Sequence, residues 1–251
     1  MILIIANDKR MAYVKEALSE FFNVTTDYEN VDYATIKYAI LPFKIAGEMM
    51  AEIVAKLPAD CFIFTPVNRD FLALAKQEVE VIMDHDEIAI YNSIPTSEGT
   101  LYHIMKNTEH TIHGANIHVI GAGRCGETLA KNLKALGANV SISSRNPRLV
   151  ARLFEAGITV ATDDEKIGVA DVIVNTVPAL MLGENQLQQV KKSCYIADIA
   201  TAPGGVDFKA AKQMGLHAEL LPALPGIVAP RTAAIYLAQF IKRKIDERSC
   251  P

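Results

Sequence analysis

The chain has 251 residues, of which 50% are hydrophobic and 22% charged, and its 25 Lys and Arg against 29 Asp and Glu give a formal net charge of −4. This composition is typical of a soluble globular protein with one large domain or two smaller ones, and it excludes a disordered, collagen-like or disulfide-stapled chain. Because no Lys/Arg-rich run is present, neither nucleic acid nor an anionic membrane surface is an expected partner.

The amino-terminal sequence and the spacing of the cysteines bear on the cellular compartment of the protein. The start, MILIIANDKR, has a short apolar run that does not resemble a signal peptide, and no stretch approaches the roughly 18 apolar residues that span a bilayer. Cys61, Cys125, Cys194 and Cys250 form no CxxC pair, and the histidines form no HExxH motif. We therefore expect a cytoplasmic protein with reduced thiols, no membrane span and no bound metal.

In the first half of the chain, short apolar runs alternate with segments of helical period, as in a parallel sheet with crossover helices. The predicted strands are Met1–Ala6, Val24–Thr26, Tyr38–Pro42, Cys61–Thr65 and Val79–Met83. The predicted helices are Lys9–Phe22, Ala46–Lys56 and Asp70–Gln77. These elements predict an N-terminal α/β domain over residues 1–95.

A polar run at Tyr91–Thr100 precedes a predicted helix, Thr96–Asn107, that links the two halves of the chain. Pro95 suits an early helical position, and the free N–H groups beyond it can hold a carboxylate. Candidate substrate-binding side chains in this run are Asn92, Ser93, Thr96 and Ser97. Simple N-capping of the helix explains the same residues nearly as well.

The second half repeats the alternation of strands and helices. Its predicted strands are Asn116–Ile120, Val140–Ser143, Thr159–Val160, Val172–Thr176, Tyr195–Ile199 and Ala218–Leu221, and its helices are Cys125–Ala135, Pro147–Ala156, Asn185–Val190, Phe208–Met214 and Arg231–Arg248. We predict an α/β fold of two domains, the second a doubly wound Rossmann domain over residues 96–251. Inter-domain helices at about 96–110 and 231–248 would bracket a cleft. A single continuous sheet is the alternative.

A glycine-rich motif, Gly121-Ala-Gly123-Arg124-Cys125-Gly126, follows the strand and opens the next helix. In this context Gly121 permits a tight turn, Gly123 lets the backbone approach a pyrophosphate, and Gly126 allows close packing of helix on strand. The free N–H groups of the first helical turn, which includes Arg124 and Cys125, receive the phosphate charge. The motif predicts dinucleotide binding.

The end of the second strand of this domain bears on which dinucleotide binds. An acidic residue there would bind both ribose hydroxyls of NAD and repel a 2′-phosphate, but the sequence has none. It reads Ser143-Ser144-Arg145-Asn146, with Arg148 and Arg152 after it, and hydroxyl and guanidinium donors suit a phosphate. NADP is therefore favoured over NAD, unless the arginines only solvate a helix.

Two later strand ends border the expected nicotinamide position. Thr176, Val177 and Pro178 lie at the end of the fourth strand, and Asp198 and Ala200 lie at the end of the fifth. Small and polar residues commonly line this edge of the sheet. Asp198 is equally well explained as a site residue or as a cap of its loop.

The Pro- and Gly-containing loop Pro222–Ala233 carries Arg231, which can pair a second carboxylate or simply be a surface arginine near a helix start. The positive charge is poorly placed for the helix dipole, which slightly favours a function. His103, His110 and His113 lie near the linking segment. None of them can be assigned as a catalytic base, so the catalytic residue stays unknown.

Together these segments resemble the A-subunit family of dipicolinate synthases. The resemblance is close over about residues 85–245 and extends to the first 80 residues only in element order, where the chain is shorter and differs in sequence. The motifs that carry it are Ile88–Gly99, Thr111–Gly114, Gly121–Gly126, Leu136–Val140, Asn175–Pro178, Pro203–Phe208 and Leu224–Ala233.

The resemblance implies an NADP-dependent dehydrogenase that works with a flavoprotein-like B-subunit in the mother cell of a sporulating bacterium. The implied reaction forms pyridine-2,6-dicarboxylate from the cyclic dicarboxylate made by dihydrodipicolinate synthase. By the same resemblance Asn92–Gly99 and Pro225–Thr232, with Gly226, Arg231 and Thr232, would line the substrate pocket. A homo-oligomer is also expected.

Two other functions remain open. The chain can be an NADP-binding scaffold or regulatory component whose partner contributes to the chemistry, since no titratable residue is evident near the nicotinamide. It can also be a 2-hydroxyacid or shikimate-type dehydrogenase. The missing acid after the second strand argues against a 2-hydroxyacid dehydrogenase, because many of those enzymes prefer NAD.

Overall fold

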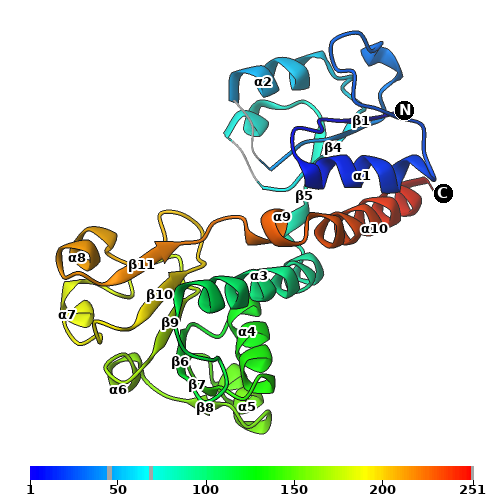
Figure 1. Cartoon of the computed structure of the whole chain (residues 1–251). Coiled ribbons are helices and arrows are strands. Elements are labelled where there is room, and N and C mark those ends of the chain that lie inside the picture. Colours follow the sequence, from blue (N-terminus) through cyan, green and yellow to red (C-terminus); the bar gives the residue numbers. More distant parts are fainter. Residues whose placement is uncertain (44–46, 68–69, 250–251) are drawn as a thin grey trace. The chain divides into compact units, whose positions relative to one another are not determined.

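The computed structural model describes residues 1–43, 47–67 and 70–249. By its contacts the chain forms two compact units, residues 1–92 with 229–251 and residues 93–228. Each unit is a parallel sheet flanked by helices (Figure 1), which confirms the predicted α/β fold with two domains. The structure therefore separates the two series of strands that the sequence predicted.

The first unit has a sheet of order β2-β1-β3-β4-β5, in which every pairing is parallel. Its strands are β1 (Ile2–Ile4), β2 (Val24–Thr25), β3 (Tyr38–Ile40), β4 (Phe62–Thr65) and β5 (Glu78–Val81). Its helices are α1 (Lys9–Ser19), α2 (Gly47–Lys56) and α10 (Pro230–Ser249), with short 3₁₀ turns at Tyr33–Thr35, Asp70–Leu74 and Ile82–Asp84. The unit also contains the first residues of α3 (Asp86–Asn107).

Alternation along the strands divides the core of this unit into two layers. Ile2 and Ile4 of β1 pack with α1 and α10, whereas Leu3 and Ile5 pack with α2 on the other face of the sheet. The α10 residues Leu237 and Ile241 are nearly inaccessible in the same cluster as Met11 of α1. The prediction that placed residues 231–248 in the second domain therefore differs from the structure, because the apolar stripe of α10 is buried on α1.

The second unit has a sheet of order β11-β10-β9-β6-β7-β8, again with parallel pairings. Its strands are β6 (Asn116–Ile120), β7 (Asn139–Ser143), β8 (Thr159–Val160), β9 (Val172–Asn175), β10 (Tyr195–Asp198) and β11 (His217–Leu220). Its helices are α4 (Arg124–Ala135), α5 (Pro147–Glu155), α6 (Asp163–Lys166), α7 (Glu184–Leu187), α8 (Phe208–Gln213) and α9 (Leu224–Val228). This strand order, with its reversal between β6 and β9, is that of a Rossmann domain.

The largest difference from the predicted elements concerns α3, which begins at Asp86 instead of Thr96. Asp86 and Glu87 give the first turn the acidic residues that stabilise a helix start, and Ile88 is buried. Pro95 therefore lies inside the helix. Asp70–Gln77 is reduced to a 3₁₀ turn at Asp70–Leu74.

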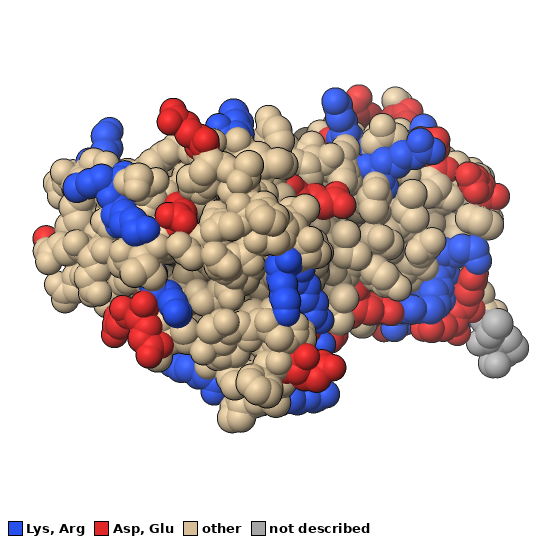
Figure 2. All heavy atoms as spheres, turned by 60° about the horizontal axis from the view of Figure 1, so that its bottom comes forward, with Lys and Arg blue, Asp and Glu red and all other residues tan. Residues whose placement is uncertain are grey.

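Some sequence predictions fall on residues outside the described part of the chain, namely Ala46 at the predicted start of α2 and the cysteine Cys250. The predicted cleft between the domains stays a prediction. Within the described residues, no helix combines the length and apolar character that crossing a bilayer requires. On the face shown in Figure 2, acidic and basic side chains are interspersed, without a large patch of one sign.

Candidate functional site

The turn between β6 and α4 has the geometry that the glycine motif predicts. Gly121 has φ +92°, which is strained for any residue with a side chain. A Cβ on Gly126 would overlap the carbonyl oxygen of Gly121, so only glycine allows α4 to pack this tightly against the strand end. The conformation of Gly121 and the close approach of Gly126 are therefore required by packing within the protein itself.

Gly123 differs from these two glycines, because a Cβ built on it would meet no protein atom within 4 Å. It is the N-cap residue of α4, and no side chain caps the helix there. This glycine precedes the positive end of a helix of 12 residues, and a ligand can approach its backbone closely. This arrangement suits the pyrophosphate of a dinucleotide.

A hollow of about 600 Å³ lies beside this turn, at the carboxyl ends of β6, β7 and β9. Eight of the predicted cofactor residues line it: Gly121, Gly123, Ser144, Arg145, Asn146, Thr176, Val177 and Pro178. They come from three separate loops that follow neighbouring strands. The structure brings these residues together, and their contact with a cofactor stays a prediction.

Five other predicted cofactor residues do not line this hollow: Arg124, Cys125, Gly126, Arg148 and Ala200. Cys125 is half-buried and hydrogen-bonds the side chain of Thr96; burial is the main reason why the pKa of its thiol is raised. Arg148 is exposed on α5, and its backbone N–H is bound by the side chain of Asn146, the N-cap of that helix. Arg152 pairs with Glu127 at 2.7 Å.

Asp198, at the end of β10, binds the loops that follow β9 and β10. Its fully buried carboxylate accepts hydrogen bonds from Asn175 Nδ2 (2.9 Å), Ala200 N (3.0 Å) and Gly205 N (2.6 Å). Asn175 in turn binds both the N–H and, through Nδ2, the carbonyl of Val177. Of the two explanations for Asp198, the structure favours the loop cap.

Asp198→Asn is expected to destabilise the protein by about 2–3 kcal/mol, because an amide NH₂ would face N–H donors in a fully buried position. Urea unfolding of the two proteins measures the difference. Asp246→Asn, which removes an exposed carboxylate paired with Lys242 on α10, is the control and should cost less than about 0.5 kcal/mol. Equal losses would contradict the assigned role of Asp198.

Sequence reasoning missed an acid near the cofactor hollow. Asp163, the first residue of α6, lines the hollow next to Ser143 and hydrogen-bonds its side chain. The Ser143 hydroxyl oxygen also accepts from Gly121 N at 3.3 Å. Burial disfavours the carboxylate, but hydrogen bonds with His118 and Ser143 outweigh it and lower the pKa of Asp163. A carboxylate therefore lines the hollow, although no acid follows β7 in the sequence.

Behind Asp163 lies His118, which was also missed. Its ring, 1% exposed, is 2.8 Å from Asp163 Oδ1 through Nε2 and 2.9 Å from Ser141 Oγ through Nδ1. A histidine between the apolar residues Ile117 and Val119 of strand β6 was the available signal. The polar chain from His118 through Asp163 and Ser143 ends at Gly121, in the glycine-rich turn.

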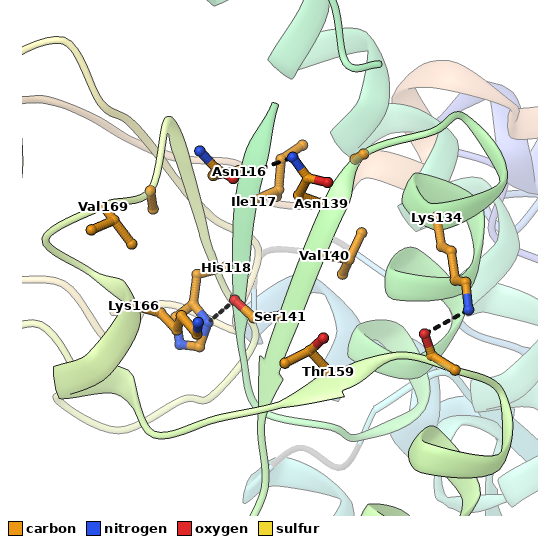
Figure 3. Close-up of a pocket in the computed structure, with 13 residues that line it drawn as sticks. Asn116, Ile117, His118, Lys134, Asn139, Val140, Ser141, Thr159, Lys166 and Val169 are labelled. Carbon is orange, nitrogen blue, oxygen red and sulfur yellow. Dashed lines mark hydrogen bonds between the residues drawn. The ribbon is translucent and has the colours of Figure 1, made fainter. Parts of the chain in front are cut away.

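Figure 3 shows a second hollow, of about 310 Å³, against β6 and β7, in which His118 and Ser141 from the neighbouring strands point toward one another. Lys134 lies at its edge and donates to the carbonyls of Ala156 (2.7 Å) and Gly157 (2.6 Å). Its charge therefore neutralises the carboxyl end of α5. His118 thus lines the second hollow and hydrogen-bonds Asp163, which lines the cofactor hollow.

The predicted substrate residues Asn92, Ser93, Thr96 and Ser97 lie within α3 and not in a loop before a helix. Ser93 is fully buried with its hydroxyl 2.7 Å from Thr128 Oγ1, and Ser97 Oγ accepts from Asn132 Nδ2 at 2.9 Å. These hydroxyls pack α3 on α4. The prediction that they follow a helix start is therefore wrong, because Pro95 is internal and exposes no first-turn N–H groups.

The predicted substrate residues near the carboxyl terminus are divided between the units. Gly226 lies in α9 of the second unit, whereas Arg231 and Thr232 lie in the first turn of α10, in the first unit. Arg231 is exposed and lines a groove of about 360 Å³ between α1 and α10, beside Phe21 and Ile235. Their role in substrate binding stays a prediction.

Comparison with known proteins identifies the family. Residues 93–210 match the model of the D-isomer specific 2-hydroxyacid dehydrogenase NAD-binding domain. The chain is 40% identical over 199 residues to the A-subunit of dipicolinate synthase from Bacillus subtilis (strain 168), a match that covers 76% of this chain and 67% of that protein.

Solved structures agree. The A-subunit of dipicolinate synthase from Bacillus halodurans has a TM-score of 0.90 at 32% identity over 96% of both chains. The corresponding structure from Bacillus subtilis has a TM-score of 0.89 at 31% identity, covering 98% of this chain and 95% of that one. D-lactate dehydrogenase of Escherichia coli, at 14% identity and a TM-score of 0.66, covers 100% of this chain and 98% of its own and shares the fold alone. The second unit is an NAD(P)-binding domain, and the chain belongs to the A-subunit family of dipicolinate synthases.

Proposed function

We propose that this chain is the A-subunit of a dipicolinate synthase, an NADP-dependent oxidoreductase that acts with a flavoprotein-like B-subunit. Its product is pyridine-2,6-dicarboxylate, formed during sporulation from the cyclic product of dihydrodipicolinate synthase. The observation that carries the proposal is the similarity over nearly the whole length of both solved A-subunit structures. The hollow beside the glycine-rich turn supports the same assignment.

The residues around the hollow suit a dinucleotide with a 2′-phosphate. The open N-terminus of α4 and Gly123 would receive the pyrophosphate. Ser144 and the exposed guanidinium of Arg145 would donate to the 2′-phosphate. The carboxylate of Asp163, which hydrogen-bonds His118 and Ser143, opposes a second negative charge here, whereas the guanidinium of Arg145 and the absence of an acid after β7 favour it. The balance favours NADP over NAD.

In the proposed reaction the substrate ring loses water and then a hydride and a proton, which leaves an aromatic pyridine. NADP, when bound, accepts the hydride. The protein supplies orientation, because Asp198 and Asn175 hold the turns that flank the expected nicotinamide position. The gain of aromaticity helps to drive the step, so a modest proton acceptor suffices.

A scaffold without its own chemistry is the second candidate, and one observation favours it. Among the described residues that line the cofactor hollow, the titratable side chains are Arg145 and Asp163, and Asp163 is engaged by His118. Neither is placed as a free proton acceptor. The match of residues 93–210 to a 2-hydroxyacid dehydrogenase domain keeps a third candidate, a 2-hydroxyacid dehydrogenase.

By family likeness we also propose that the protein acts as a homo-oligomer in the cytoplasm of the mother cell. No nucleic acid or metal enters the proposed reaction. Its partners are then the B-subunit and a small cyclic dicarboxylate.

The assignment is tested with the purified chain, NADP and substrate generated in situ by dihydrodipicolinate synthase, with and without the B-subunit. Ultraviolet absorption follows the pyridine dicarboxylate and NADPH separately. We expect both to rise in a 1:1 ratio, above the spontaneous rate, only when this chain is present.

The same experiment separates the alternatives. If the pyridine forms only at the spontaneous rate without NADPH, although calorimetry shows NADP binding, the scaffold replaces the enzyme. Oxidation of a D-2-hydroxyacid with no pyridine product would instead assign a 2-hydroxyacid dehydrogenase. A reaction without dihydrodipicolinate synthase is the control for substrate identity.

A further inference from the structure

Arg10, near the start of α1 in the first unit, is a buried cation that the cofactor site does not use. The residue is only 5% exposed. Its Nε is fully buried and has no hydrogen-bond partner in the described part of the chain. Buried polar groups are almost always paired, so an arginine with an unpaired donor in this position requires an explanation.

The position of Arg10 in the sheet is informative. It follows β1, and its Cζ lies 3.2 Å from the ring centroid of Phe43, which follows the adjacent strand β3. The chain leaves β1 for β2 on one side and β3 for β4 on the other, so the strand order reverses between β1 and β3. In open α/β sheets, ligands bind outside the carboxyl ends of the strands at this reversal.

The electrostatics of this position favour an anion. Burial lowers the pKa of Arg10 to about 10, while the charge of Asp8 acts in the opposite direction, so the guanidinium is still charged at neutral pH. Asp8 does not fully satisfy it, because the Asp8 carboxylate caps α1 by accepting from Met11 N at 2.8 Å. The position of Cζ over the Phe43 ring is a cation–π contact that holds the guanidinium in place.

We propose that the carboxyl edge of the first unit, at the reversal between β1 and β3, binds a carboxylate, and that Arg10 pairs with it. The ligand's identity rests on the proposed function: it would be one carboxylate of the cyclic dicarboxylate substrate. One edge of a planar guanidinium presents two parallel N–H donors, which match the two oxygens of a carboxylate. Because the site is little exposed to water, the attraction between the two charges is stronger than at the surface.

The test uses the full chain and calorimetric titration with pyridine-2,6-dicarboxylate, pyridine-2-carboxylate, pyruvate and NADP. Arg10→Met keeps an unbranched apolar stem against Phe43 and removes the charge, and Arg10→Lys keeps a charge without the planar fork. We expect Arg10→Met to lower the affinity for pyridine-2,6-dicarboxylate at least ~30-fold. Arg10→Lys should lower the same affinity about 5- to 10-fold. NADP affinity and the thermal midpoint should change little in either variant.

Lys9→Met is the matched control, because it removes an exposed cation from the same turn of α1 and should change no affinity more than about twofold. The preference of the wild-type protein for the dicarboxylate over pyridine-2-carboxylate should collapse in Arg10→Met. A purely structural arginine would not change this preference selectively.

The outcomes separate this inference from the proposed function. If the wild-type chain binds pyridine-2,6-dicarboxylate and Arg10→Met and Arg10→Lys bind it equally well, the inference is wrong and the proposed function stands. If the wild-type chain binds pyruvate through Arg10 but not the pyridine dicarboxylate, the carboxylate site stands and the proposed substrate is wrong. Parallel losses of NADP binding and thermal stability in both variants would make Arg10 structural and overturn the inference.

Discussion

Gly126→Ala is expected to lower the affinity for NADP by more than about 100-fold, which corresponds to about 2.7 kcal/mol. The new Cβ would overlap the carbonyl oxygen of Gly121, so the turn and the start of α4 must move apart. Because the clash is with backbone, no side-chain rotation relieves it, and the thermal midpoint should fall as well. Isothermal titration with NADP and thermal unfolding measure the two effects.

Gly123→Ala is the matched variant, because it tests the binding of NADP at this turn without disturbing how the turn folds. Its φ of −69° suits alanine, and a Cβ meets no protein atom within 4 Å. Stability should therefore be unchanged, while NADP affinity falls about 10-fold or more because the methyl group occupies the space for the pyrophosphate. Unchanged NADP binding in Gly123→Ala would refute the assignment of this turn to the pyrophosphate.

The second large effect is expected from Arg145→Asp. This substitution should lower the affinity for NADP by about 10- to 100-fold and change the affinity for NAD by less than about threefold. Arg145 is exposed at the rim of the cofactor hollow, beside Ser144, where a 2′-phosphate would lie. The substitution replaces attraction for that phosphate with repulsion, and NAD lacks the phosphate. Titration with both oxidised dinucleotides by calorimetry is suitable, since the chain has no tryptophan to report binding.

Lys209→Asp supplies the same change of charge on α8 and should leave both affinities nearly unaltered, because this lysine does not line the cofactor hollow. Equal losses of NADP and NAD in Arg145→Asp would remove the 2′-phosphate assignment. A preference for NAD in the wild-type protein would assign the dominant influence to Asp163 instead of Arg145.

The site was predictable where its residues lie close together in the sequence. Gly121, Gly123 and Gly126 could be found because a strand, a turn and a helix are consecutive, and their spacing is set by the turn itself. Ser144 and Thr176 could be found because each follows a strand whose carboxyl end meets the same edge of the sheet. Asp163 and His118 were harder to find, because Asp163 opens a short helix after the edge strand β8 and His118 lies inside a strand, so neither belongs to a dinucleotide-binding motif.

Pro95 shows the opposite case, in which a strong local signal predicts a helix start that the structure does not have. Proline is frequent at the first position of a helix, and the polar residues after it resemble a cap. In the structure α3 already starts at Asp86 and continues through Pro95 into its contacts with α4. Packing of Ser93 and Ser97 against α4 stabilises the helix around the proline, and no pattern within α3 itself reveals that partner.

By itself the sequence determined a parallel α/β fold in two domains, the position of the dinucleotide turn and the family, because these depend on periodicity and on short consecutive motifs. Only the tertiary structure decided that α10 packs on α1, that Asp163 and His118 stand behind Ser143, and that Arg10 lies over Phe43. Each of these contacts joins residues from different elements. They depend on strand order and on the burial of complementary faces, which local periodicity does not encode.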